Sequence, residues 1–244
     1  MIKNSGKETI CYQSMAAAML RAADKNQAQH LAYFFKTGPG QYGEGDKFLG
    51  IKAPATRSLV KKYGAAEFSE IELLLADEYH EIRLLGLLIL VNRYEKAKTD
   101  ADKAMIVRFY HANRQGINNW DLVDLSVYKI WGDYLLHHPE KRKELYRYAK
   151  SKRLWERRMA VVATMALIKA GEFTEILKLA VLLQNDKEDL MHKAVGWMLR
   201  EVGKKDIKTL RVFLDEKAKH LPRTALRYAI ERLPEKERQH YLKI

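Results

Sequence analysis

The sequence predicts an all-α protein built as a curved array of two-helix units. Three observations predict this fold. Apolar residues recur at intervals of three and four over most of the 244 residues, which is the spacing of amphipathic helices. No stretch alternates apolar and polar residues between hairpin turns, so strands are not expected. One sequence pattern also recurs along the chain, which predicts a repeat architecture.

The helical spacing is clearest in three segments. Their apolar positions are Ile82, Leu85, Leu88 and Ile89, then Met159, Val162, Met165 and Ala166, and finally Val195, Met198 and Leu199. The chain contains only 5 prolines, and four of its 13 glycines fall within residues 38–45. We therefore expect helix nearly throughout, interrupted by a Gly-rich loop at residues 37–52.

Five short segments align without gaps, and each lies in a predicted helix that follows a shorter helical stretch. They begin at Arg83, Asp121, Arg158, Lys193 and Thr224, at intervals of 38, 37, 35 and 31 residues. Two-helix units at roughly this spacing are typical of HEAT-like solenoids, which are α-α superhelices with a concave surface formed by the second helix of each unit. We expect residues 1–244 to form one such domain.

The charge of the chain indicates a polyanionic partner. Lys and Arg number 44 against 31 Asp and Glu, which gives a formal charge of +13. Nucleic acid and an anionic membrane surface both fit such an excess, and a merely soluble basic protein is the alternative. The longest apolar stretch, residues 84–91, is too short to span a bilayer. The single cysteine, Cys11, allows no intramolecular disulfide, and we expect a soluble cytoplasmic protein.

Three of the five repeated segments begin with a basic residue, namely Arg83, Arg158 and Lys193. Equivalent positions in stacked repeats point the same way, so these side chains are expected to form a row suited to a phosphate backbone. The alternative is that they are surface cations paired with neighbouring acids, Glu81, Glu156 and Glu201.

The second segment is the exception, because it begins with Asp121 and places Asp124 three residues later. Trp120 and Asp124 stand four residues apart and share one helical face. Asp124 follows a predicted cap at residues 118–119, where the helix dipole favours an ionised carboxylate. Beside an aromatic ring in a basic cleft, such a carboxylate suits a cationic or oxocarbenium-like species. The alternative is a helix-terminus acid and a core tryptophan, while Asp121 is expected to serve the helix end or a neighbouring repeat.

An ordered set of segments resembles the bacterial DNA alkylation repair family of HEAT-like glycosylases, the AlkD type. The matching segments are AYFFK at residues 32–36, FLGI at 48–51 followed by Pro54, WDLVD at 120–124, LWERR at 154–158 and KAVGWMLRE at 193–201. Asn119 stands where the best-known members carry a second tryptophan. The resemblance covers about residues 31–201.

This resemblance implies hydrolysis of the N-glycosidic bond of N3- and N7-alkylated purines in double-stranded DNA, without base flipping. It implies that Asp124 is the catalytic carboxylate and that Trp120 and Trp197 contact the backbone and sugar of the lesion nucleotide. Arg158 is implied to hold phosphate, with Tyr33 near the same cleft. The full set of residues expected to contact DNA is Tyr33, Lys52, Arg158, Lys193 and Arg200. No metal, cofactor or obligate protein partner is expected, and the protein is expected to be a monomer.

Two further interpretations stay open from the sequence. The chain could be a non-catalytic HEAT-repeat protein that binds distorted or branched DNA, or a protein-binding solenoid scaffold. The Gly-rich loop could touch DNA through its backbone amides and Tyr42, or it could pack against the first repeat. It is no nucleotide-binding P-loop, because no Gly-Lys-Ser/Thr follows it.

Overall fold

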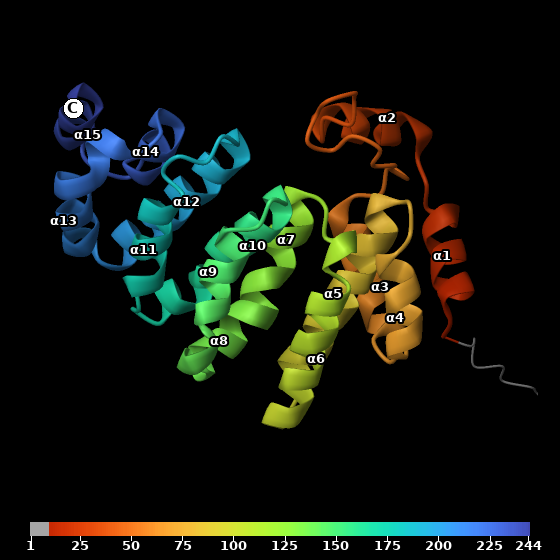
Figure 1. The fold of residues 1–244 in the computed structure, drawn as a ribbon. Coiled ribbons are helices and arrows are strands. Elements are labelled where there is room, and N and C mark those ends of the chain that lie inside the picture. Colours follow the sequence, from red (N-terminus) through yellow and green to blue (C-terminus); the bar gives the residue numbers. More distant parts are fainter. Residues whose placement is uncertain (1–9) are drawn as a thin grey trace, which may run out of the picture. The chain divides into compact units, whose positions relative to one another are not determined.

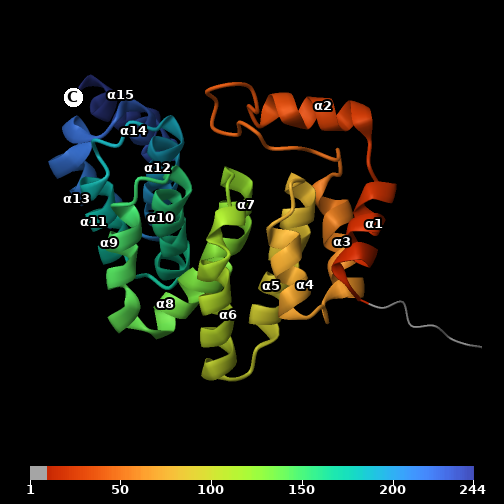
Figure 2. The ribbon, with the colours of Figure 1, turned by 45° about the vertical axis from the view of Figure 1, so that its right-hand side comes forward.

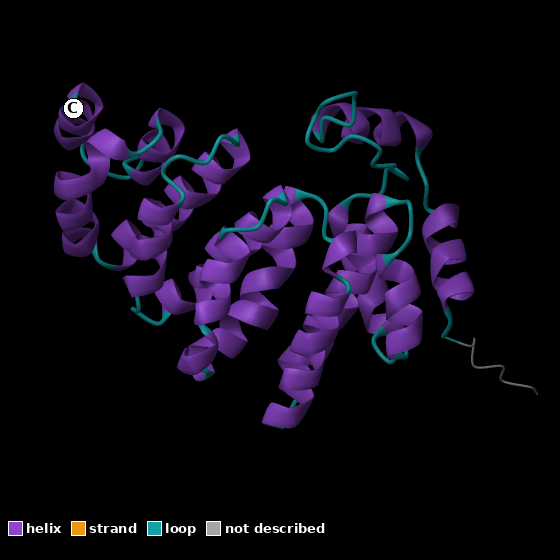
Figure 3. Ribbon diagram, viewed as in Figure 1, coloured by secondary structure: helices purple, strands orange, loops and turns teal. Residues whose placement is uncertain are grey.

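The computed structural model describes residues 10–244 of the chain. Within that range the regular structure is helical, without strands, and one isolated β-bridge joins Lys47 to Tyr79 (Figure 3). The all-α prediction is confirmed. Each helix of the described part is too short or too polar to cross a membrane.

The chain divides into two compact units, Met1–Leu122 and Val123–Ile244. The described part of the first unit holds α1 (Tyr12–Arg21), α2 (Lys25–Phe34), α3 (Ala53–Tyr63), α4 (Phe68–Leu75), α5 (His80–Lys96), α6 (Asp100–Ala112) and the start of α7 (Trp120–Val127) (Figure 1). The second holds the rest of α7, α8 (Asp133–His137), α9 (Lys143–Ala149), α10 (Leu154–Lys169), α11 (Thr174–Leu182), α12 (Asp189–Lys205), α13 (Ile207–Lys217), α14 (Arg223–Ala229) and α15 (Glu235–Lys243). A single domain over residues 1–244 and the curvature of the array stay predictions.

The predicted two-helix repeat is confirmed. The five aligned segments fall in α5, α7, α10, α12 and α14, and each of these helices follows another one, namely α4, α6, α9, α11 and α13. The first helix of a pair is not always the shorter, because α13 has 11 residues and α14 has 7. The helix that begins with α7 continues through a π-helical stretch, Tyr128–Gly132, into α8.

In the second unit, the second helices of successive pairs pack against one another. α12 packs against both α10 and α14, while α9 covers α10 and α11 covers α12. The apolar positions Met159, Val162, Val195 and Met198, predicted from the helical spacing, are all buried. A Cβ added at Gly196 would lie 2.4 Å from a carbonyl oxygen of α14, so this glycine permits the close approach of α12 to α14.

In the first unit, α5 is the central helix and packs against α3, α4 and α6. It is buried on nearly all sides, and its first turn includes three charged or titratable residues that are also buried: His80, Glu81 and Arg83. Buried charged groups are stable only when paired or hydrogen-bonded. Each of the three has a partner in the Gly-rich loop, which lies at this end of α5.

The Gly-rich loop, residues 37–52, connects α2 to α3 and packs against the first unit (Figure 2). The Glu81 carboxylate accepts hydrogen bonds from the backbone N–H groups of Leu49, Gly50 and Ile51, at 2.9, 2.8 and 3.1 Å. The side chain of Tyr42 donates a hydrogen bond to the carbonyl of Phe34. The loop is therefore held by the protein itself, and its contact with DNA stays a prediction.

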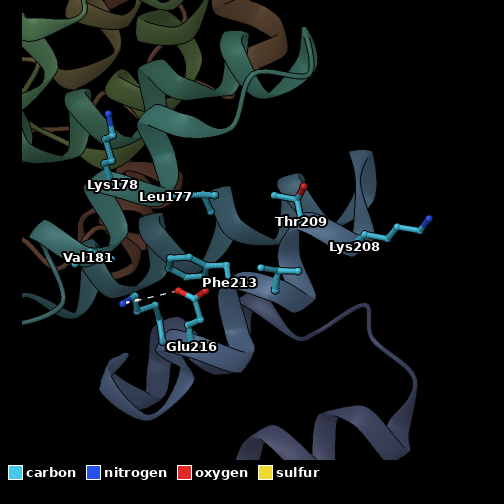
Figure 4. A pocket seen from close by; sticks show the side chains of 9 residues that line it. Leu177, Lys178, Val181, Lys208, Thr209, Phe213 and Glu216 are labelled. Carbon is cyan, nitrogen blue, oxygen red and sulfur yellow. Dashed lines mark ion pairs between the residues drawn. The ribbon is translucent and has the colours of Figure 1, made fainter.

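One apolar groove lies on the surface of the second unit, between α11 and α13. Its volume is about 660 Å³, and the aliphatic and aromatic side chains of Leu177, Val181 and Phe213 line it (Figure 4). Lys178 and Lys208 extend outward at its edges.

Candidate functional site

Trp120 is the first residue of α7, and its backbone is fixed by the residue before it. The side-chain oxygen of Asn119 accepts a hydrogen bond from the Trp120 N–H at 2.9 Å. The Asn119 amide then donates to Asp46 Oδ2 at 3.2 Å, and Asn119 itself is fully buried. The cap predicted ahead of this helix is thus connected to the Gly-rich loop.

The indole ring of Trp120 lies at the end of a stack of aromatic rings, which we call the ring ladder (Trp120, Phe35 and Phe48). Trp120 stacks on Phe35 with centroids 5.3 Å apart and an interplanar angle of 21°. Phe35 in turn stacks on Phe48 at 5.0 Å and 19°. Phe34 meets the indole edge-on at 6.1 Å. Offset and edge-on contacts of this kind are favourable, so the ladder restrains the orientation of Trp120.

A buried polar cluster lies beside the ring ladder, and we call it the loop anchor (Asp46, His80, Arg83, Asn119 and Asp121). His80 Nδ1 is 3.0 Å from Asp46 Oδ2, and His80 Nε2 is 2.9 Å from Asp121 Oδ2. Arg83 pairs with Asp46 and donates to the carbonyl of Asp77 at 2.8 Å. The two cations offset the two carboxylates, which is the condition for burying such groups.

His80 is held in its charged form by this arrangement. Burial favours the neutral imidazole and lowers its pKa, but the hydrogen bonds to Asp121 and Asp46 outweigh burial and raise the pKa of His80 to about 9. For Asp46, burial raises the pKa, yet the hydrogen bond from His80 and the charge of Arg83 prevail and hold the pKa below its usual value. At neutral pH both imidazole nitrogens therefore donate hydrogen bonds.

Asp124 lies one turn after Trp120 on α7, and its carboxylate is clamped by Arg158 of α10. Arg158 Nε donates to Asp124 Oδ1 at 3.0 Å, and Arg158 Nη2 donates to Asp124 Oδ2 at 2.8 Å. The third donor, Arg158 Nη1, binds the carbonyl of Leu190 at 2.6 Å. A two-point pair of this kind fixes the plane of the carboxylate as well as its position. The Asp124 side chain is 15% exposed.

The other residues predicted for the site lie on several helices. Trp197 of α12 is half-buried, and its Nε1 donates to Glu201 at 3.2 Å. Lys193 pairs with Asp189 at 2.7 Å, and Arg200 pairs with Glu231. Tyr33 of α2 is 87% exposed and Lys52, directly before α3, is exposed. Their contacts with DNA stay predictions.

The predicted row of accessible cations needs correction at two of its three positions. Arg83 and Arg158 are buried, with 4% and 5% of their surface exposed, and each pairs with an aspartate. The alternative partners are wrong as well, because the observed ones are Asp46, Asp124 and Asp189. The three acids of that alternative bind elsewhere: Glu81 holds the loop, Glu156 pairs with Arg153, and Glu201 pairs with Lys204.

Sequence reasoning missed the loop anchor and the ring ladder. Asp46 lies in a loop 34 residues before His80, and Asp121 lies 41 residues after His80. No local pattern connects positions so far apart. One signal was present, since His80, Glu81 and Arg83 directly precede or begin the longest apolar stretch of the chain, residues 84–91, and charged residues there require partners. The expectation that Asp121 serves a neighbouring element agrees with its bond to His80.

The fold and this site define a helical-repeat protein that carries an aromatic ring and a clamped carboxylate on a single helix. Residues 15–233 match the family of DNA alkylation repair enzymes, and the chain belongs to that family. A solved structure titled "Predicted DNA alkylation repair enzyme from Enterococcus faecalis" has a similar fold. Its TM-score is 0.69 and its sequence identity 18%, over 87% of this chain and 97% of that chain. No curated protein matches the sequence.

Proposed function

We propose that the chain is a monofunctional DNA glycosylase that hydrolyses the N-glycosidic bond of N3- and N7-alkylated purines without base flipping. The observation that carries this proposal is the pair of Asp124 and Arg158. Arg158 fixes both oxygens of the carboxylate, at 3.0 and 2.8 Å, while the side chain of Asp124 keeps 15% of its surface exposed. A carboxylate held in this way can stabilise positive charge without reorganising during the reaction.

The chemistry needs little else from the protein. An N3- or N7-alkylated purine is already cationic, so the bonding electron pair leaves with the base and no general acid is required. The C1′ atom that remains is oxocarbenium-like, and Asp124 would stabilise its positive charge. Asp124 would also orient the water whose oxygen bonds to C1′ and whose proton the carboxylate accepts. The products are a free neutral base and an abasic site.

The aromatic residues would position the lesion nucleotide. Trp120 follows Asn119 and lies against Phe35, so its ring is oriented before DNA arrives and offers a wall for the sugar and backbone. Trp197 would supply a second wall. The contacts to phosphate would come from Lys52, Lys193 and Arg200, with Tyr33 beside the backbone, while Arg158 is buried and orients Asp124 instead. The net charge of +13 favours a DNA partner. We place the protein in the cytoplasm as a monomer.

The test is base release from defined duplexes. Separate duplexes carry 7-methylguanine, 3-methyladenine, or the neutral bases uracil and hypoxanthine, and mass spectrometry measures the free base. The proposal expects release of the two cationic bases alone, and an abasic strand that stays uncut until alkali is added. Tight, salt-sensitive duplex binding without any release would instead favour the non-catalytic DNA-binding protein. Absence of both would favour the protein-binding scaffold.

A further inference from the structure

We propose that His80 is a positioning residue, whose imidazolium ties the Gly-rich loop through Asp46 to the first turn of α7 through Asp121 and thereby fixes Trp120. His80 itself is buried. Its side chain is 3% exposed, so its own contact with a substrate is excluded. This inference rests on the proposed function only for the effect of Trp120 on base release.

Three routes lead from His80 to Trp120. The first runs through Asp121, which is bonded to His80 Nε2 at 2.9 Å and is the next residue in the chain after Trp120. The second runs through Asp46 to the Asn119 amide, whose oxygen accepts from the Trp120 N–H.

The third route is the ring ladder. The His80 ring stacks on Phe48 at 4.7 Å, and it lies 5.0 Å from Phe35, on which Trp120 stacks. A change in the position of His80 therefore reaches both the backbone and the ring of Trp120. Because the three routes converge on one residue, the cluster does more than satisfy buried charges.

The protonation state of His80 decides whether it can donate hydrogen bonds to both Asp46 and Asp121. An imidazolium donates from both nitrogens, while a neutral imidazole donates from one and presents a lone pair at the other. Asp46 faces Nδ1 from the loop, and Asp121 faces Nε2 from α7. Arg83, which lies on α5 with His80, pairs with Asp46. Phe48 stacks on the His80 ring, and Phe35 lies tilted against it with centroids 5.0 Å apart. When His80 loses a proton, one of the two carboxylates faces a lone pair and loses its hydrogen bond. The loop is released if that carboxylate is Asp46, and the start of α7 is released if it is Asp121.

The experiment follows Trp120 directly in the intact protein. The four tryptophans are labelled with 5-fluorotryptophan, and the Trp120→Phe variant assigns its ¹⁹F resonance. In the wild-type protein we expect one sharp Trp120 signal at neutral pH that shifts in step with the ring signals of His80 as the pH rises. In His80→Gln we expect a displaced or broadened Trp120 signal that does not shift with pH in this range. The rate of base release should be about tenfold to a hundredfold lower.

Tyr146→Phe is the matched control, because it removes a half-buried hydrogen bond to Glu175 in the second unit. It should leave both the pH-dependent shift of the Trp120 signal and the rate of base release unchanged. A Trp120 signal that is insensitive to pH and identical in His80→Gln overturns the inference, and the wild-type titration decides this even if the variant does not fold. If the pH-dependent shift of the Trp120 signal is present but the wild-type protein releases no base, the positioning role stands and the proposed function falls.

Discussion

Arg158 donates two hydrogen bonds to Asp124, from Nε to Oδ1 and from Nη2 to Oδ2, and its third nitrogen, Nη1, donates to the carbonyl of Leu190. Asp124 thus depends on a helix, α10, that the sequence places in the next repeat. The carboxylate is oriented by a buried guanidinium, and α12 holds that guanidinium in place through Leu190. This arrangement makes Arg158 the support of the proposed catalytic group.

Arg158→Lys should keep the charge but lose the two-point grip on Asp124. Lysine cannot form the planar fork, so we expect base release to fall about tenfold to a hundredfold, with a loss of about 1–3 kcal/mol in the free energy of unfolding. Single-turnover kinetics and urea denaturation measure the two effects. Arg157→Lys is the control, because Arg157 pairs with Asp186 in a similar way at 2.6 and 3.2 Å. Equal losses of activity in the two variants would contradict this role of Arg158.

The free energy of unfolding should fall at alkaline pH, because the loop anchor depends on the charged form of His80. The pKa of His80 is raised from 6.5 to about 9 in the folded protein, so its contribution is complete below pH 6.5 and disappears as the pH rises through about 9. A shift of this size corresponds to on the order of 3 kcal/mol. Urea denaturation between pH 6 and 9.5 should show the loss in the wild-type protein and a much flatter profile in His80→Gln. Parallel profiles would show that His80 is not the titrating group.

Low pH should also weaken the loop anchor, because Asp46 becomes protonated. The pKa of Asp46 lies below its ordinary value of 3.8, so its contribution is present above that value and is lost as the pH falls through the lowered pKa. Asp46→Asn should remove this acid-sensitive part of the unfolding free energy. Unfolding curves between pH 2 and 5 measure it, and an acid profile identical to that of the wild-type protein would count against the assignment.

Gly50 should tolerate substitution far less well than Gly40. Both have positive φ, 84° and 72°, but a Cβ at Gly50 would lie 2.1 Å from the Asp24 carbonyl oxygen, while nothing lies within 4 Å of one at Gly40. Gly40→Ala should cost about 1 kcal/mol of backbone strain, and Gly50→Ala about 3 kcal/mol or more. Urea denaturation compares them, and similar losses would mean that the loop does not pack on Asp24 in this way.

The helices and their repeat could be predicted because their signals are local. The spacing of Met159, Val162 and Met165 predicts a buried helical face, and these residues form the core of α10. The placement of Trp120 and Asp124 one turn apart followed from their separation of four residues. In the structure one helix, α7, carries both.

The support of the site could not be predicted in the same way. Asp124 and Arg158 are 34 residues apart, and the aligned repeats suggested that Arg158 pointed to solvent rather than to an acid of the preceding pair. Asp46 lies in a stretch that the sequence predicts only as a Gly-rich connection, since nothing local distinguishes a loop aspartate that binds a buried histidine. Such partners are chosen by tertiary packing, which brings distant segments together.

Asp124→Asn removes the negative charge of the proposed catalytic carboxylate and keeps the size of the side chain. Single-turnover release of 7-methylguanine from a duplex is compared in the wild-type protein, in Asp124→Asn and in Asp133→Asn, which makes the same change at the start of α8. Melting curves and duplex binding confirm that each variant is folded. We predict a fall of about a hundredfold to a thousandfold for Asp124→Asn and the wild-type rate for Asp133→Asn. Release by folded Asp124→Asn at the wild-type rate would show that Asp124 is not the catalytic carboxylate.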